Sequence, residues 1–97
     1  MPSNDKVKKF FWLSFCDPDK PKGSQFLGAN IIEASDAIMA HFGSGIYGCN
    51  PGGEVKIIEI PQTANDMFDH VKDTNRLLSA KEIEERWGIV KLENFHA

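Results

Sequence analysis

Residues 7–16, VKKFFWLSFC, constrain the fold more than any other part of the chain. A run this dense in aromatic and apolar residues is typical of a β-strand. Side chains alternate between the two faces of a strand. One face carries Phe11, Leu13 and Phe15, and the other carries Phe10, Trp12 and Ser14. Because both faces carry large apolar groups, we expect this strand to lie in the centre of a sheet.

Two more strands are predicted, at residues 25–33 and 54–60. The loop before the first of them holds two prolines and a glycine, and the turn Asn-Pro-Gly-Gly precedes the second. Simple alternation assigns the side chains of residues 25–33 to two faces. One would carry Leu27, Ala29 and Ile31, and the other Phe26, Asn30 and Ile32.

A helix is expected between the second and third strands. Ser35 suits the N-cap position, with Asp36 as the first helical residue. An apolar stripe with a spacing of four runs through this segment, formed by Ala34, Ile38, Phe42 and Ile46. Such a stripe predicts an amphipathic helix.

Two helices are predicted after the third strand. Residues 64–72 form the weaker one. The stronger one begins at Ser79, which forms a capping box with Glu82, and it ends before Gly88. Residues 89–92 are expected to add a short edge strand or to pack loosely.

The predicted order is therefore β-β-α-β-α-α, an α+β fold. A right-handed crossover makes the second and third strands parallel, and the first strand fits between them, antiparallel to both. The result is a small three-stranded split β-α-β sheet, in the order 2-1-3, with helices packed on it. We expect one domain, residues 1–97, with a flexible segment at 1–6 and a loosely packed tail at 89–97. Because one helical layer cannot cover two apolar faces, either the late helices or a second copy must cover the second face. We expect a homo-oligomer.

Composition excludes several classes of protein. The net charge of −3 argues against binding to polymeric nucleic acid, which needs a basic surface. No apolar run approaches the roughly 20 residues of a membrane helix, and we expect no membrane partner. Two cysteines are too few for a disulfide framework, and the first residues lack the long apolar region of a signal peptide. We therefore expect a cytoplasmic protein.

Motifs of catalysis, cofactor binding and metal binding fail their tests. Residues 43–48 match G-x-G-x-x-G, but a helix precedes them and a turn follows, the reverse of a dinucleotide site. A calcium loop starting at Asp17 would need Gly and Glu where Lys22 and Gly28 stand. Neither Cys16 nor Cys49 has the surroundings of a reactive thiol. We expect no cofactor and no metal, and an enzyme is the third choice.

Two polar loops remain as candidate binding elements, and both are expected at the same end of the sheet. The first offers cations, a hydroxyl, an amide and backbone N–H groups that suit a phosphate or carboxylate. The second offers glycines for close approach and polar groups for a base or sugar. The candidate residues are Lys20, Lys22, Gly23, Ser24 and Gln25 in the first loop, and Asn50, Gly52, Gly53 and Glu54 in the second. Trp12 is the candidate for stacking on the ligand.

The segments PKGSQFLG (residues 21–28) and NPGGEV (residues 50–55) resemble a family of short, largely uncharacterised proteins of bacteriophages and bacteria. The residues 12–15 and 76–79 resemble that family too. The resemblance implies no specific activity. It suggests an analogy with small phage proteins that sequester nucleotide immune signals.

Our first functional hypothesis is a non-enzymatic, oligomeric and phage-encoded protein that sequesters a small phosphate-bearing ligand, such as a nucleotide signal. Its location would then be the host cytosol. The alternative is an interaction or inhibitor module that docks a host or viral protein through its apolar sheet face. An enzyme would need Asp17, Asp19 and Glu54 to converge on a ligand.

Overall fold

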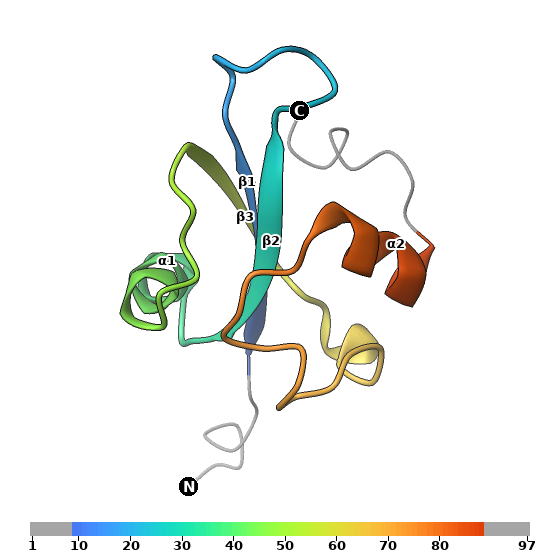
Figure 1. Ribbon diagram of the computed structural model, residues 1–97. Helices are drawn as coiled ribbons and strands as arrows, with labels where there is room; N and C mark the ends of the chain where they lie inside the picture. The colour runs from blue at the N-terminus through green and yellow to red at the C-terminus, as the bar shows by residue number, and fades with distance from the viewer. Residues whose placement is uncertain (1–8, 89–97) are drawn as a thin grey trace, which may run out of the picture.

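The computed structural model describes residues 9–88. Figure 1 shows a sheet with helices on two sides of it. In chain order, the elements are β1 (Phe10–Cys16), β2 (Phe26–Glu33), α1 (Ala37–Ile46), β3 (Glu54–Glu59), the 3-10 helix η2 (Gln62–Ala64) and α2 (Ala80–Trp87). The predicted flexible segment 1–6 and the predicted tail 89–97 lie outside the described residues.

The sheet has the order β2-β1-β3, and β1 is antiparallel to both neighbours. Trp12 of β1, for example, pairs with Ile31 of β2 and with Ile58 of β3. β2 and β3 therefore run parallel to each other and are joined through α1. These observations confirm the predicted α+β fold and the central place of the aromatic strand.

Each face of the sheet has its own hydrophobic cluster. The α1-side cluster is Phe11, Leu13, Phe15, Ile32, Ala40 and Cys49, all buried. The α2-side cluster is Phe10, Ala29, Ile31, Phe68, Leu78 and Ile83, also buried. Figure 1 shows α1 on one side of the sheet, with α2 and the segment before it on the other. Of the two alternatives for the second face, the late part of the chain therefore provides the cover. That face gives no reason of its own for an oligomer.

The first helix starts one residue later than predicted. Asp36, not Ser35, is the N-cap: its backbone is extended (φ −157°) and its Oδ1 accepts a hydrogen bond from Met39 N at 2.9 Å. Asp and Ser are about equally good N-caps, so the sequence alone did not separate them.

The orientation of α1 is the main departure from expectation. The helix buries Ala40 and Ser44 against the sheet, while the predicted stripe residues Ile38, Phe42 and Ile46 are 81%, 68% and 72% exposed. The inner face of α1 lies close to β2, because a Cβ on Gly43 would lie 3.1 Å from the Ile32 side chain. Small residues permit this approach, and the large apolar residues point away from the sheet.

The predicted helix at residues 64–72 is wrong. The chain forms η2 and then a series of turns. Asp69 Oδ1 accepts hydrogen bonds from the N–H groups of Val71 and Lys72, both at 2.8 Å, and Asp73 Oδ2 accepts one from Asp69 N at 2.7 Å. Aspartate side chains that bind nearby backbone N–H groups compete with helical hydrogen bonds.

The facing of residues 26 and 27 was also predicted wrongly. The register of β1 with β2 shifts between Phe15 and Cys16, which is a β-bulge. Gly28 has φ +131° there, and a Cβ on it would lie 2.8 Å from the Leu77 side chain. The bulge breaks the alternation. Leu27 therefore packs on the α1-side cluster and Phe26 on the α2-side cluster.

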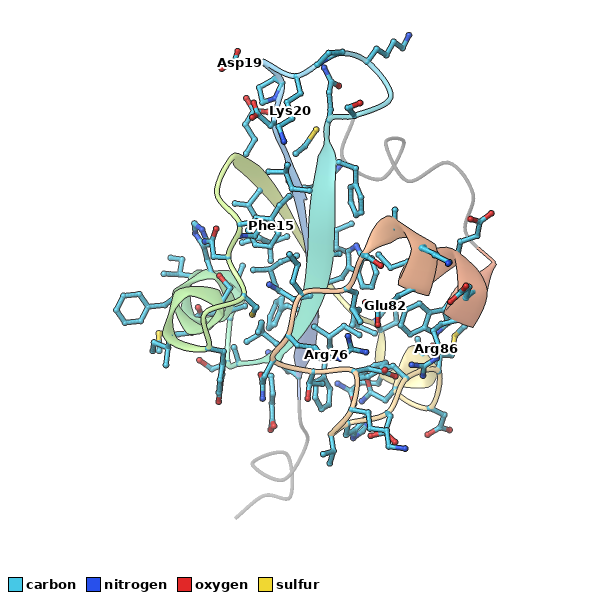
Figure 2. All side chains as sticks on the ribbon, in the orientation of Figure 1. Phe15, Asp19, Lys20, Arg76, Glu82 and Arg86 are labelled. Carbon is cyan, nitrogen blue, oxygen red and sulfur yellow. The ribbon has the colours of Figure 1, made fainter. Side chains whose placement is uncertain are left out.

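The helix α2 agrees with its sequence signature. Ser79 and Glu82 form the capping box, and Gly88 ends the helix with φ +72°. An ion-pair network ties the helix to the preceding turns. Arg86 donates to both carboxylate oxygens of Asp73 at 2.5 and 2.6 Å, and Arg76 donates to Glu82 Oε2 at 2.9 Å. Figure 2 shows Arg76, Glu82 and Arg86 together on this side of the molecule.

Candidate functional site

Both candidate loops lie at the end of the sheet where β1 finishes. Cys16, the last residue of β1, pairs with Phe26 at the start of β2 and with Glu54 at the start of β3. Figure 2 shows Asp19 and Lys20 of the first loop at this end, away from the ion pairs of α2. The predicted order 2-1-3 thus brings the two loops to one end of the sheet, as the sequence indicated.

Most polar groups of the first loop hold the loop itself together. Gln25 Nε2 donates to the carbonyl oxygens of Pro18 (3.3 Å) and Lys20 (3.0 Å). Asp17 Oδ1 accepts from Asp19 N at 3.0 Å. Gly23 has φ +94°, as this turn requires. Lys20, Lys22 and Ser24 are exposed, and no described carboxylate pairs with either lysine.

The polar groups and glycines of the second loop likewise have structural roles within the fold. Asn50 Oδ1 accepts from Gly52 N at 2.8 Å, and Asn50 Nδ2 donates to Ser44 Oγ of α1 at 3.4 Å. A Cβ on Gly53 would lie 2.5 Å from the carbonyl oxygen of Cys16, so glycine is needed there for close contact with β1. Behind the loop, buried Asn30 donates to the carbonyl oxygen of Cys49 at 2.9 Å. Sequence reasoning missed Asn30 as an anchor.

The electrostatics at this end of the sheet are mixed. Burial raises the pKa of the Cys16 thiol, and the carboxylates of Glu54 and Asp17 raise it further. The carboxylates of Asp17 and Glu54 therefore lie near Cys16, where the two loops meet, and their negative charge opposes the binding of a phosphate. Burial also raises the pKa of Cys49, although the hydrogen bond from Asn30 acts in the other direction. Raised pKa values leave both thiols protonated and poorly nucleophilic at neutral pH.

Trp12 does not join the loops. It is four residues before Cys16 in β1, which is about 13 Å along a strand. Its side chain instead lines an apolar groove on the α2 side of the sheet. A ligand held by the loops and stacked on Trp12, as the sequence suggested, would have to span that length.

The apolar groove has a volume of about 420 Å³ and runs between β3 and the segment that follows it. Its lining is Trp12, Ile31, Ile58, Glu59, Ile60, Pro61, Ala64, Met67, Phe68 and Trp87. Trp12 and Trp87 meet edge to face with ring centroids 6.2 Å apart. Trp87 Nε1 donates to the carbonyl oxygen of Met67 at 2.6 Å, which fixes the outer wall. Ile58 and Met67 remain exposed.

The indole Nε1 of Trp12 is buried and has no hydrogen-bond acceptor among residues 9–88. A buried donor without a partner costs roughly 1–3 kcal/mol, and native proteins keep few of them. Because the Nε1 atom has almost no accessible surface, Trp12 presents only the apolar part of its ring to the groove.

Sequence reasoning found one wall of this groove and missed the other. Trp12 was singled out, and the sheet face around it was identified as apolar. Met67 and Trp87 were not identified as part of the same surface. Residues 64–72 were expected to form a helix, whereas they form turns beside β3. The one available signal was the apolar character of both Ile58 and Ile60, on one face of the predicted strand next to Pro61.

Two features are absent from the described part of the chain, a group of metal ligands and a helix that could span a membrane. Among residues 9–88, no three His, Cys, Asp or Glu side chains are grouped as metal ligands. Neither α1 nor α2, nor any other helix in that range, is long and apolar enough to cross a membrane.

The chain matches no protein-family model, none of the curated proteins and no solved structure. The resemblance to the phage and bacterial family therefore stays an expectation.

Proposed function

We propose that this protein is a non-enzymatic interaction module that docks an apolar segment of a partner protein in the groove between Trp12 and Trp87. The groove carries the proposal: it combines about 420 Å³ of apolar volume with exposed Ile58 and Met67. Tryptophan and methionine are enriched in protein interfaces, and tryptophan often dominates their binding energy.

A protein segment suits the groove better than a polar small molecule. Sites for small molecules usually hold several converging polar groups that fix the ligand's orientation. This lining is apolar apart from Glu59. A basic residue of the partner would suit Glu59, and the net charge of −3 favours such a partner at long range.

The two tryptophans of the chain both lie in the groove, so intrinsic fluorescence reports on its occupancy. We expect a displayed peptide library to yield apolar sequences with a basic residue, and these peptides to shift the emission. Ile58→Glu should weaken their binding at least about tenfold. Val71→Glu is the matched control, because Val71 is 84% exposed and lies outside the groove. Selected peptides that bind Ile58→Glu as well as the wild type would contradict the proposal.

A phosphate-bearing small ligand, such as a nucleotide signal that the protein sequesters, is the second candidate. It is favoured by the exposed Lys20, Lys22 and Ser24, which lie at the same end of the sheet as the 50–54 loop. Calorimetry with a panel of nucleotides tests it, with the double variant Lys22→Ala/Ser24→Ala as the control that should lose the ligand. Since Trp12 is about 13 Å away, such a ligand should leave the tryptophan emission unchanged.

We further propose a cytoplasmic location, in the host cell if the protein is phage-encoded. Both cysteines are buried as free thiols, which a reducing compartment maintains.

A further inference from the structure

The outer face of α1 is apolar, carries no Asp, Glu, Lys or Arg, and is not covered by any other element of residues 9–88. Its outward stripe is Ile38, Phe42 and Ile46, flanked by the exposed Met39 and Tyr47. The ten residues of α1, AIMAHFGSGI, contain no Asp, Glu, Lys or Arg, although these make up 26% of the chain. Soluble helices normally place charge on the face that meets water. Figure 1 shows α1 as the outermost layer on its side of the sheet, with α2 on the other side.

The same face carries both a projection and a hollow. The Phe42 ring projects from it, 68% exposed. Beside the ring is a hollow lined by Ile38, His41, Phe42, Gly45 and Ile46. Gly45 forms its open part, because a Cβ placed there would meet nothing within 4 Å. Phe42 and Gly45 are three residues apart and therefore adjacent on the helix surface.

We propose that a second copy of this chain docks here, with the two α1 helices antiparallel across a twofold axis between Phe42 and Gly45. Phe42 of each copy then lies over Gly45 of the other, and Ile46 lies between Ile38 and His41 of the other. A twofold interface requires one patch to be complementary to itself. The Phe42 ring and the hollow at Gly45 lie about one turn apart on the same helix, so the patch can be complementary to itself.

Charge supports a second copy over a different partner. An interface between identical copies brings together two chains with the same net charge of −3, which costs energy if the interface itself is charged. A helix without charged residues avoids this cost. Antiparallel helices also place each helix N-terminus near the other's C-terminus, which their dipoles favour.

The area is adequate for a reversible dimer. With about 200 Å² for each large side chain, the five exposed residues would bury at most about 600 Å² per copy, when the interface covers all of their exposed area. That gives about 1,200 Å² in total, the lower end of specific interfaces. We therefore expect a dissociation constant in the micromolar range. The Trp12–Trp87 groove lies on the opposite face and stays open in each copy, so this inference does not depend on the proposed function.

Sedimentation velocity over about 5–500 µM protein tests the dimer. The wild type should move from 10.9 kDa toward twice that mass. Phe42→Glu should stay monomeric, with its fold confirmed by circular dichroism, while Val71→Glu should associate like the wild type. Mixing Phe42→Glu with Phe42→Lys should restore a heterodimer, because the two substituted positions lie near the axis. A wild type that stays at 10.9 kDa throughout, or a Phe42→Glu variant that associates normally, would overturn the inference.

Discussion

The helices α1 and α2 pack on the sheet in opposite ways. α2 inserts Ile83, which is fully buried, and carries charged residues on its outer face. α1 turns Ala40, Gly43 and Ser44 toward the sheet and its large apolar residues toward solvent. Both helices are amphipathic and both have side-chain N-caps. Local sequence signals therefore specify where each helix forms, but they do not determine which face of the helix packs on the sheet.

The difference teaches what an apolar stripe does and does not indicate. A stripe shows which face of a helix gains most from leaving water. It does not show whether the chain's own sheet or another molecule covers that face. On α1 the aromatic strand already fills the space under the helix with Phe11, Leu13 and Phe15, and only small residues fit there.

Two isoleucines provide the largest test of this contrast. Ile83→Ala should lower the free energy of unfolding by about 3 kcal/mol, because it opens a cavity in the α2-side cluster. Ile38→Ala should change it by less than about 0.5 kcal/mol, because this side chain is 81% exposed. Urea denaturation of dilute protein measures both. Equal losses would show that α1 buries its stripe within the monomer.

Acid should loosen α2 through Asp73. Burial alone would raise the pKa of this carboxyl, but the hydrogen bonds from Arg86 and from Asp69 N, with the charges of Arg86 and Arg76, hold it below the ordinary value. The unfolded chain therefore binds the proton more readily, and stability is lost as the pH falls through the folded pKa, below about pH 4.

The variant Asp73→Asn should cost about 2 kcal/mol at pH 7 and flatten this pH dependence. Amide exchange measured near pH 3 and near pH 6 localises the effect. After correction for the intrinsic rates, residues 80–87 should lose protection before residues 37–46. A variant with the wild-type pH profile would contradict the role given to Asp73.

The two glycines of α1 give the smallest and most local test. Gly45→Ala should stabilise the monomer by about 0.5–1 kcal/mol, since alanine favours helix and the added Cβ meets open space. Gly43→Ala should gain little or nothing, because its Cβ would press on Ile32 at 3.1 Å. Thermal unfolding compares the pair, and an equal gain at both positions would show that α1 does not pack tightly on β2.

Much of the fold could be predicted from the chain. Two apolar faces on residues 10–16 placed β1 in the centre, and the capping box of Ser79 located α2. The errors have physical reasons. The bulge at Gly28 reverses the facing of the residues before it, and alternation cannot reveal a bulge. Residues 64–72 form turns instead of the expected weak helix, because Asp69 and Asp73 bind backbone N–H groups there. Asp73 is also held by the distant Arg86, a contact that the local sequence does not reveal.

The candidate sites were less predictable. The meeting of the two loops followed from strand order, but their polar residues Gln25 and Asn50 turned out to be occupied by backbone groups of the loops. The groove joins Trp12 to Trp87 across 75 residues of sequence, and no local pattern reports such a contact. Both outward apolar surfaces became visible only when exposure was known.

The most direct test of the contrast between α1 and α2 is a dilution series of amide spectra of the wild-type protein by nuclear magnetic resonance. We predict that, between about 1 mM and 10 µM, the amide shifts of residues 37–47 move with concentration, while those of residues 79–88 stay constant. Spectra in which the α1 amides do not change over that range would contradict the account.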